Sequence, residues 1–387
     1  MTRPDLGSIA SDTALARLWA ALPEARLVGG VVRDLLVGAK IADIDLATPD
    51  APDIMASKLA AAGIKSVPTG LAHGTLTAVV MARGFEITSL RRDVATDGRH
   101  AVVAFTDDWR EDAARRDFTC NAMSIDHDGV LHDFFNGEAD LRAGRVRFVG
   151  DPAARLAEDY LRLLRYFRFQ ARFGLVPPDG ATRKALIDAV PGLGRLSVER
   201  VWHELKRILA IPDPRAAIAL MADLGVLAAV LPEGASPARL AALIDAGAPA
   251  NPILRAAALL DGDAAAFAAR LRLSGAERDR LLALRGEVPD DGADDNTLRR
   301  ALANAPRAIL LDRAWLAGRS NHLRARLAAM PVPVFPLQGR DLAAAGMAHG
   351  PEIGRRLAEL RAWWWQGGCL ADRAACLEEL TTQGNSR

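Results

Sequence analysis

Three acidic residues have the types and spacing of a metal site. Asp43 and Asp45 alternate with apolar residues in the run DIDL, and residues two apart on a strand point to the same face. Two carboxylates on one face repel each other unless a cation lies beside them, and hard oxygen ligands favour Mg²⁺. Glu86 lies on the polar face of the run FEIT. If these two strands are neighbours, the three carboxylates could hold two Mg²⁺ ions, as phosphoryl-transfer sites do.

Two glycines form a candidate anion site. Gly29 and Gly30 follow an apolar segment and precede an expected helix that contains Arg33. Glycines let the backbone approach a ligand closely, and the first N–H groups of a helix suit a phosphate. The run matches neither GxGxxG nor GxxxxGK[ST], so the sequence supports neither a dinucleotide fold nor a P-loop.

Two arginine-containing motifs could bind the remaining parts of a nucleotide. Arg115 and Arg116 close an expected helix before Asp117 and Asn121, and paired guanidinium groups next to small polar residues suit a triphosphate and a ribose. Asp159 and Arg162 are expected on one helical face, where they could read the edge of a nucleobase by hydrogen bonds.

Each motif also has an interpretation without chemistry. An aspartate pair such as Asp43 and Asp45 is common in exposed turns, and a charge such as Glu86 on an edge strand discourages aggregation. Arginines at the end of a helix can cap its carbonyl groups. Glu158 and Arg162 have the spacing of an ordinary surface ion pair on a helix.

The elements that position these residues change in type along the chain. Residues 1–145 mix strand-like and helix-like patterns, and the alternating segments on either side of Arg83-Gly84 predict a hairpin. Asp128-Gly129 predicts a second hairpin. From residue 151 onward, helical periodicity dominates. One helix is expected to begin near Pro152, and its buried stripe would consist of Tyr160, Leu164, Phe167 and Ala171.

Composition limits the class of protein. The 387 residues favour two to three domains, and a chain that is 50% hydrophobic and 25% charged is neither disordered nor fibrous. The net charge of +1 requires any nucleic acid to meet a local basic patch, such as the eight arginines against three acids in residues 142–172. Three cysteines without zinc spacing, and no apolar run of the roughly 18 residues that span a membrane, predict a cytoplasmic protein.

Seven motifs along residues 26–210 resemble those of one family. They read, in order, LVGGVVRDLLVG, DIDLAT, FEITSLRRD, RRDFTCNAMSID, DFFNGEADLRAGRVRFVGDP, AEDYLRLLRYFRFQARFG and LSVERVWHELKRIL. In this order they resemble the class II tRNA nucleotidyltransferases (CCA-adding enzymes) and the bacterial poly(A) polymerases. The resemblance is weaker beyond residue 210.

The resemblance implies an α+β fold and an activity. A polymerase-β-like nucleotidyltransferase head with a mixed sheet and helices would occupy residues 1–145. An all-helical neck with a nucleotide-selecting helix (146–212), a body (213–330) and a tRNA-binding tail (331–387) would follow. The implied reaction is the template-independent, Mg²⁺-dependent addition of CCA to the 3′ end of tRNA from CTP and ATP. No membrane and no obligate protein partner are implied.

The resemblance also implies roles for individual residues. By motif match, Asp43 and Asp45 are the metal ligands, and Glu86 is the third catalytic acid. The triphosphate and the ribose would be bound by Gly29, Gly30, Arg33, Arg116, Asp117 and Asn121. The incoming base would be selected by Asp159 and Arg162, with Arg165 and Arg168 nearby on the triphosphate or in the packing of the neck.

Three other functions stay open at this point. A poly(A) polymerase would use the same site on other RNA, and a partial enzyme would add only CC or only A. The polar, glycine-containing segment 91–100 is expected to be the flexible loop of enzymes that add the terminal A. A catalytically inactive RNA-binding protein is disfavoured, because Asp43, Asp45 and Glu86 are all present.

Overall fold

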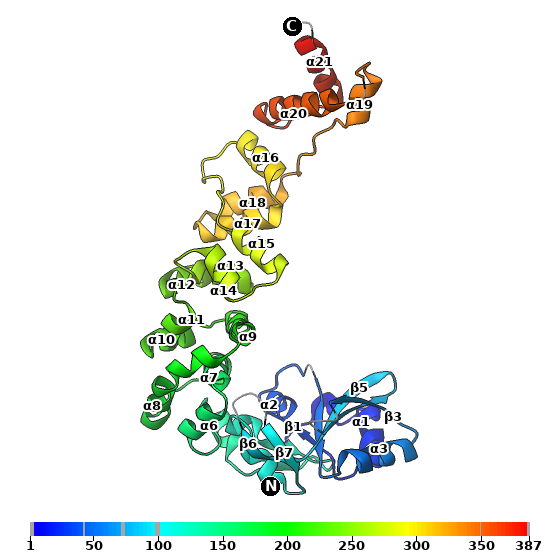
Figure 1. Cartoon of the computed structure of the whole chain (residues 1–387), viewed down its shortest axis with the longest axis vertical. Helices are drawn as coiled ribbons and strands as arrows, with labels where there is room; N and C mark the ends of the chain where they lie inside the picture. The colour runs from blue at the N-terminus through cyan, green and yellow to red at the C-terminus, as the bar shows by residue number, and fades with distance from the viewer. Residues whose placement is uncertain (1–3, 42, 71–73, 97–100, 349, 385–387) are drawn as a thin grey trace. The chain divides into compact units, whose positions relative to one another are not determined.

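The computed structural model describes residues 4–41, 43–70, 74–96, 101–348 and 350–384. The chain forms two compact units, Met1–Pro232 (unit 1) and Glu233–Arg387 (unit 2). In Figure 1, unit 1 runs from blue to green and unit 2 from yellow-green to red. Strands and helices alternate in the first part of unit 1, and helices follow, as the predicted α+β class requires.

A mixed sheet of seven strands forms the first part of unit 1. Its strand order is β3-β4-β5-β2-β1-β8-β9. The strands are β1 (Arg26–Val28), β2 (Asp45–Thr48), β3 (Lys65–Gly70), β4 (Thr75–Val80), β5 (Arg83–Ser89), β8 (Met123–Ile125) and β9 (Leu131–Asp133). β2 and β5 run parallel, and the other neighbouring strands run antiparallel. A parallel pair needs a long crossover connection, which α3 (Pro52–Ala61), β3 and β4 supply here.

The first hairpin turns two residues earlier than the sequence predicts. β4 ends at Val80 and β5 begins at Arg83, so Met81 and Ala82 form the turn, with φ of 49° and 62°. Gly84 lies within β5 and pairs with Val79. The prediction of a turn at Arg83-Gly84 is wrong, because this register places the alternate residues of both strands on the buried face, and a slip by one residue would expose them. The second predicted hairpin is confirmed by the pairing of β8 with β9.

The expected loop at residues 91–100 is for the most part a second small sheet. β6 (Arg91–Thr96) pairs with β7 (Ala101–Phe105) in an antiparallel arrangement, with a bulge between Asp93 and Ala95. Residues 97–100 lie outside the described residues. The expectation followed the polar composition of the segment, whereas the β-branched Val102 and Val103 of β7 favour a strand that β6 can pair with.

The helix expected from Pro152 is two helices. α6 (Pro152–Glu158) ends before Asp159, whose backbone is extended, and α7 (Leu161–Phe173) begins two residues later. The Asp159 carboxylate accepts a hydrogen bond from the N–H of Leu161 at 3.0 Å. Aspartate favours this position because its side chain satisfies an N–H group that a new helix leaves free. The predicted buried stripe is wrong at its ends, since Tyr160 and Ala171 are only half-buried.

The aromatic cluster of unit 1 joins residues near the sheet to α7. Phe118 is fully buried, and the centroid of its ring lies 5.0 Å from that of Phe148 and 4.7 Å from that of Phe169. Tyr166 stacks on Phe148 at 5.6 Å. Phe169 and Tyr166 belong to α7, whereas Phe118 and Phe148 form an isolated β-bridge outside the named strands. These contacts hold α7 against the strand-containing part of unit 1.

Short helices complete unit 1. Among them, α2 carries Arg33, and α9 packs along α7. The remaining bounds are η1 (Gly7–Ile9), α1 (Thr13–Ala21), α2 (Gly30–Leu36), α4 (Trp109–Ala114), η3 (Thr119–Asn121), α5 (Gly137–Arg142), α8 (Gly180–Asp188), η4 (Val190–Arg195), α9 (Val198–Leu209), α10 (Arg215–Asp223) and α11 (Val226–Val230).

Unit 2 contains no strand among residues 233–348 and 350–384. Two of its hydrophobic clusters centre on Leu298 and Leu327, and on Leu360 and Trp364. The helices are α12 (Pro237–Asp245), α13 (Pro252–Leu259), α14 (Ala264–Arg270), α15 (Gly275–Ala283), α16 (Asp295–Asn304), α17 (Arg307–Leu316), α18 (Asn321–Ala329), α19 (Gly339–Ala344), α20 (Pro351–Gln366) and α21 (Arg373–Gly384). In the part of the chain that the structure describes, no helix is long and apolar enough to cross a membrane.

Candidate active site

The three candidate acids line one cleft in unit 1. Asp45 is the first residue of β2 and pairs in register with Glu86 of β5, as the sequence predicts for neighbouring strands. Asp43 precedes β2, so the expectation of both aspartates on one strand is wrong. All three residues line the same cleft of about 870 Å³. The parallel register therefore brings Glu86 to the aspartates from 41 residues away in the sequence.

The charges around Asp45 are those of a cation site. The cleft wall partly removes water from its carboxylate and raises its pKa, and the negative charges of Glu86 and Asp43 raise that pKa further, while Arg116 opposes the shift. Among the described residues, no three acidic, histidine or cysteine side chains are grouped closely enough to hold a metal ion alone. Carboxylate oxygens are hard ligands, and they suit a divalent ion that keeps several waters and also takes oxygen ligands from a substrate.

The glycine motif lies on the wall of the same cleft. Gly29 has a φ of 71° and immediately precedes α2, whose first residue is Gly30. A side chain at Gly29 would place its Cβ 3.0 Å from a terminal nitrogen of Arg116. Positive φ and this close approach both explain a glycine here. The cleft wall is thus formed by bare backbone next to a guanidinium group.

Arg33 is buried and held from several sides. One terminal nitrogen donates to Oδ1 of Asn121 at 2.7 Å, and the Nε donates to Asp34 at 3.0 Å. The guanidinium carbon lies 5.2 Å from the ring centroid of Phe169 and 4.8 Å from that of Phe173. A guanidinium group fixed in this way is pre-organised for a second anion, because little side-chain entropy is left to lose.

Asp112 orients the paired arginines. Its carboxylate is almost fully buried and accepts from Arg115 at 2.7 Å and from Arg116 at 3.1 Å. Burial alone would raise the pKa of Asp112, but Arg116 and Arg115 hold it below its ordinary value. Sequence reasoning assigned Asp112 no role, although its spacing of three and four residues from the arginines is that of helical ion pairs.

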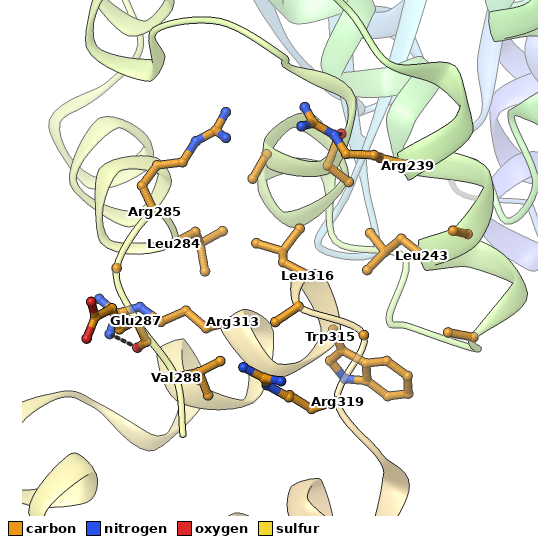
Figure 2. Close-up of a pocket in the computed structure, with 17 residues that line it drawn as sticks. Arg239, Leu243, Leu284, Arg285, Glu287, Val288, Arg313, Trp315, Leu316 and Arg319 are labelled. Carbon is orange, nitrogen blue, oxygen red and sulfur yellow. Dashed lines mark hydrogen bonds between the residues drawn. The ribbon is translucent and has the colours of Figure 1, made fainter. Parts of the chain in front are cut away.

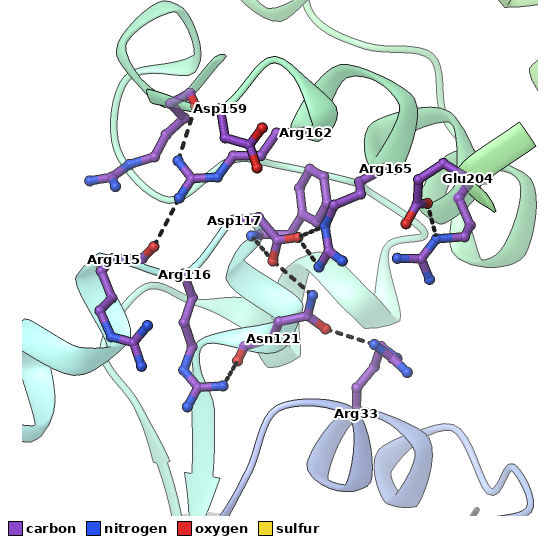
Figure 3. A network of polar contacts seen from close by, with 12 residues as sticks. Arg33, Arg115, Arg116, Asp117, Asn121, Asp159, Arg162, Arg165 and Glu204 are labelled. Carbon is purple, nitrogen blue, oxygen red and sulfur yellow. Dashed lines mark hydrogen bonds and ion pairs between the residues drawn. The ribbon is translucent and has the colours of Figure 1, made fainter. Parts of the chain in front are cut away.

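Asp117 lies at the centre of a buried polar network (Figure 3). Its Oδ2 accepts from Nε of Arg165 at 2.7 Å, and its Oδ1 accepts from the side-chain amide of Asn121 at 2.9 Å. Burial would raise the pKa of Asp117, but the charge of Arg165 and these hydrogen bonds hold it below its ordinary value. Because Asn121 also accepts from Arg33, the network connects α2, η3 and α7.

Asp159 and Arg162 lie close together but have separate partners. Oδ2 of Asp159 accepts from Arg200 of α9 at 2.8 Å. Arg162 donates to the carboxylate of Glu158 and to the carbonyl oxygen of Arg155, the latter at 3.0 Å. The prediction of one helical face is wrong, because Asp159 occupies the break between α6 and α7 and only Arg162 is helical. The alternative Glu158–Arg162 ion pair is present as well.

The last two arginines of the motif also line the cleft. Nε of Arg168 donates at 2.7 Å to Glu204 of α9, whose side chain is almost fully buried. Arg165 is held by Asp117. Burial would lower the pKa of Arg165, but the negative charge of Asp117 raises it above its ordinary value. Sequence reasoning missed Glu204 and Arg200, because no local pattern indicates a partner that lies 36 or 41 residues away.

These features together define a class of protein. Every sequence-predicted site residue lines the one cleft, where acids that fit a metal ion lie beside arginines that suit a triphosphate. With a mixed sheet at the N-terminal side and helices after it, this is a nucleotidyltransferase.

Comparison with known proteins identifies the family. The family described as "Poly A polymerase head domain" matches residues 25–147, and the one described as "Probable RNA and SrmB- binding site of polymerase A" matches residues 178–236. CCA tRNA nucleotidyltransferase 1, mitochondrial, from Mus musculus is 38% identical over 366 residues, covering 89% of this chain and 83% of that protein. Its Homo sapiens counterpart is 38% identical over 363 residues, with the same coverage of 89% and 83%.

A solved structure agrees. The crystal structure of the Bacillus stearothermophilus CCA-adding enzyme in complex with CTP matches with a TM-score of 0.74 and 26% sequence identity. The match covers 97% of this chain and 100% of that chain. The chain belongs to the family of CCA tRNA nucleotidyltransferases, also called CCA-adding enzymes.

Proposed function

We propose that this enzyme adds CCA to the 3′ end of tRNA, using CTP and ATP and no nucleic-acid template. The observation that carries the proposal is the cleft, which joins the acids of the sheet to the arginines of α7 in a single cavity. The 38% identity to relatives named CCA tRNA nucleotidyltransferase, over 89% of the chain, supports the same reaction. The Bacillus stearothermophilus enzyme was crystallised in complex with CTP, which supports the choice of substrate.

Within this proposal, Asp43 and Asp45 hold Mg²⁺ and Glu86 supports them as the third acid. A divalent ion bound there supplies Lewis acidity toward the attacking 3′ hydroxyl and the triphosphate. The support for this role is that Asp45 pairs in register with Glu86 and that all three acids line one cleft. The pKa of Asp45 is raised by burial first and then by the charges of Glu86 and Asp43. The acids themselves orient the reacting groups, and their negative charge draws the cation into a cleft that is otherwise rich in arginine.

The nucleotide would lie along the arginine side of the cleft. We assign the triphosphate to the backbone of Gly29 and Gly30 and to Arg33, because these groups form one wall. We assign the ribose and the phosphates to Arg116, Asp117 and Asn121, and further phosphate contacts or support of the neck to Arg165 and Arg168. Support for these roles comes from the buried network in Figure 3, which fixes the guanidinium groups before any ligand arrives.

Asp159 and Arg162 would select the base. A carboxylate accepts from an amino group and a guanidinium donates to a ring nitrogen or carbonyl, which are the groups on the edges of cytosine and adenine. Both side chains are held by neighbours before a nucleotide binds, Asp159 by Arg200 and Arg162 by Glu158. The incoming base would take over part of these hydrogen bonds.

Replacement of Arg162 by alanine is expected to lower selectivity more than tRNA affinity. The variant loses the donor that distinguishes CTP and ATP from UTP and GTP, and each good hydrogen-bond pair of this kind contributes about 1–3 kcal/mol of discrimination. Relative kcat/KM for the four nucleotides, measured on one tRNA, reports the change. Arg142→Ala, which removes an exposed arginine outside the cleft, is the matched control. Selectivity equal to that of the wild type would refute the assignment.

The reaction itself is tested with purified protein, Mg²⁺ and labelled CTP and ATP, given singly and together. One substrate is a tRNA transcript that ends at its discriminator base, and an unstructured RNA is the control. Growth of the tRNA by three nucleotides followed by a stop establishes CCA addition. Growth by CC alone, or by A alone on a tRNA that ends in CC, would indicate a partial enzyme.

Poly(A) addition is the second candidate function. The observation that favours it is the match of residues 25–147 to a family described as the poly(A) polymerase head domain. In the same assay, a long ladder with ATP alone on either RNA would establish this function and would contradict CCA addition. The relatives that match 89% of the chain are named CCA tRNA nucleotidyltransferases, so we favour CCA addition over poly(A) addition.

We make two further proposals, on the division of the chain into parts and on its cellular location. We propose the division into head, neck, body and tail at residues 145, 212 and 330, as the resemblance implies. We also propose a cytoplasmic location, supported by three free, buried cysteines that suit a reducing compartment. The mammalian relatives are named as mitochondrial, so fractionation of the source cells with an antibody to the chain is the test.

A further inference from the structure

Unit 2 contains a pocket that shares no lining residue with the catalytic cleft. It is enclosed by α12, α13, the end of α15 and the end of α17, and has a volume of about 650 Å³. Its inner surface is apolar and includes Leu243, Leu284 and Leu316. Figure 2 shows these leucines between two ends of the pocket, with Arg239 and Arg285 at one end and Trp315 beside Arg319 at the other.

The charge of the pocket lining is strongly positive. Four arginines line the pocket and Glu287 is the only acid among its lining residues. Burial lowers the pKa of Arg285, the positive charge of Arg239 lowers it further, and the negative charge of Asp261, outside the lining, opposes the shift. Two guanidinium groups that repel each other at a half-open apolar pocket are stabilised by an anion placed between them.

The arginines at the open end have hydrogen-bond donors to spare. Arg285 donates to the carbonyl oxygen of Leu260 at 3.0 Å, and it has no ion pair within the described part of the chain. Arg239 donates to backbone carbonyls, and its ion pair with Asp261, at 2.9 Å, is largely exposed to water. A surface pair of this kind contributes little and exchanges readily. Each guanidinium carries five N–H groups, so both can still bind a phosphate.

The opposite end of the pocket is rigid and aromatic. The guanidinium of Arg324 stacks on the Trp315 ring at 3.5 Å from its centroid, which fixes the plane of the indole. Arg313 donates to the carbonyl oxygens of Ala283 and Glu287 at 2.7 Å and 2.9 Å, and so ties α17 to the end of α15. The shape of the pocket is therefore set by contacts that leave the end with Arg239 and Arg285 open.

We propose that this pocket binds a nucleotide, with its phosphate between Arg239 and Arg285 and its base against the leucines and Trp315. Nucleotide sites combine three features. They have a planar guanidinium group that binds phosphate, an apolar surface, and an aromatic side chain against the base. The volume suits one nucleotide. The nucleotide is either free in solution or one unit of an RNA chain. A site for a free nucleotide lies beyond the proposed function, which uses the cleft in unit 1, whereas a site for a unit of RNA rests on that function and extends its binding of tRNA.

Two variants test the pocket without touching the catalytic cleft. Arg285→Ala removes the phosphate ligand that has no ion pair. Ala242→Trp fills the pocket from an exposed lining position on α12 and changes no charge. Arg278→Ala is the control, because Arg278 is an exposed arginine on α15 that pairs with the adjacent Asp279 and does not line the pocket.

Two measurements identify the source of the nucleotide. Equilibrium dialysis with labelled ATP and Mg²⁺ counts the molecules bound per chain, and filter binding at several salt concentrations gives the affinity for a tRNA transcript. A free nucleotide predicts two ATP per chain in the wild type and the control, and one in both pocket variants. A nucleotide of RNA predicts one ATP per chain throughout and a tRNA Kd raised about tenfold in both pocket variants, as for the loss of one charge-assisted contact.

Two results would overturn the proposal. One is a single ATP per chain in the wild type together with an unchanged tRNA Kd in both pocket variants. The other is a Kd raised by Arg285→Ala but not by Ala242→Trp, which would make Arg285 a surface charge without a pocket ligand. CCA addition at saturating tRNA should be the same in all four proteins, so failure of this proposal is distinct from failure of the catalytic one.

Discussion

Asp45→Asn is expected to lower the rate of nucleotide addition by a factor of about 10³ or more, with tRNA affinity unchanged. The carboxylate lies opposite Glu86 in the parallel register, and under the proposed function it is a ligand of the divalent ion. A metal ion supplies several kcal/mol of charge stabilisation in a phosphoryl-transfer transition state, which corresponds to this factor. Single-turnover addition of one nucleotide, together with a separate tRNA-binding measurement, reports the two effects.

Controls separate loss of the metal from loss of the fold. Asp107→Asn changes an exposed aspartate that does not line the cleft and should keep full activity. The double variant Asp43→Ala, Asp45→Ala should still bind tRNA and add no nucleotide. If the double variant loses tRNA binding but still adds nucleotides, the assignment of Asp43 and Asp45 as metal ligands is wrong.

The Asp45→Asn substitution should not lower the stability of the fold. The pKa of Asp45 is raised, so the folded chain disfavours its ionised form, and this destabilisation is fully present above the raised pKa and is relieved as the pH falls through it. Asparagine removes the charge at every pH. Without divalent ions at neutral pH, the thermal midpoint of Asp45→Asn should therefore be equal to or above that of the wild type. A large drop in the midpoint would mean that the inactivity reflects unfolding.

Phe118→Ala is expected to destabilise unit 1 by about 3–5 kcal/mol, the usual cost of removing a buried aromatic ring. Phe118 is fully buried, and its ring contacts those of Phe148 and Phe169. Hydrogen exchange of the slowest amides of β1 measures the opening free energy of unit 1, even if unit 2 unfolds separately. Phe105→Ala, at a position with 46% exposure, is the control and should cost far less. An equal cost in both variants would contradict the role of the aromatic cluster.

The sequence predicts the position of the candidate acids better than it predicts their surroundings. The register of β2 and β5 confirms that Asp45 and Glu86 lie on neighbouring strands, whereas Asp43 lies before β2 and not on it. The break before α7 is not predicted, although Asp159 is a favourable capping residue, because the expected apolar stripe includes Tyr160, which lies in the break itself. Glu204 and Arg200 could not be assigned, since only the packing of α9 on α7 brings them to the cleft.

The position of the first hairpin turn and the small sheet of β6 and β7 were also not predicted from local sequence signals. The hairpin was expected at Arg83-Gly84 because glycine is the strongest local turn signal, whereas the register that buries alternate residues puts the turn at Met81-Ala82. The sheet of β6 and β7 forms from a segment whose polar composition resembles a loop. In both cases pairing with a neighbouring strand outweighs the local preference.

The break between α6 and α7 couples a backbone amide to the side chain of Asp159. Oδ1 of Asp159 holds the N–H of Leu161, and its Oδ2 holds Arg200. Any ligand that draws this carboxylate toward itself must also loosen the first turn of α7. The nitrogen and proton chemical shifts of the Leu161 amide therefore report on the hydrogen bonding of Asp159, without a label on the substrate.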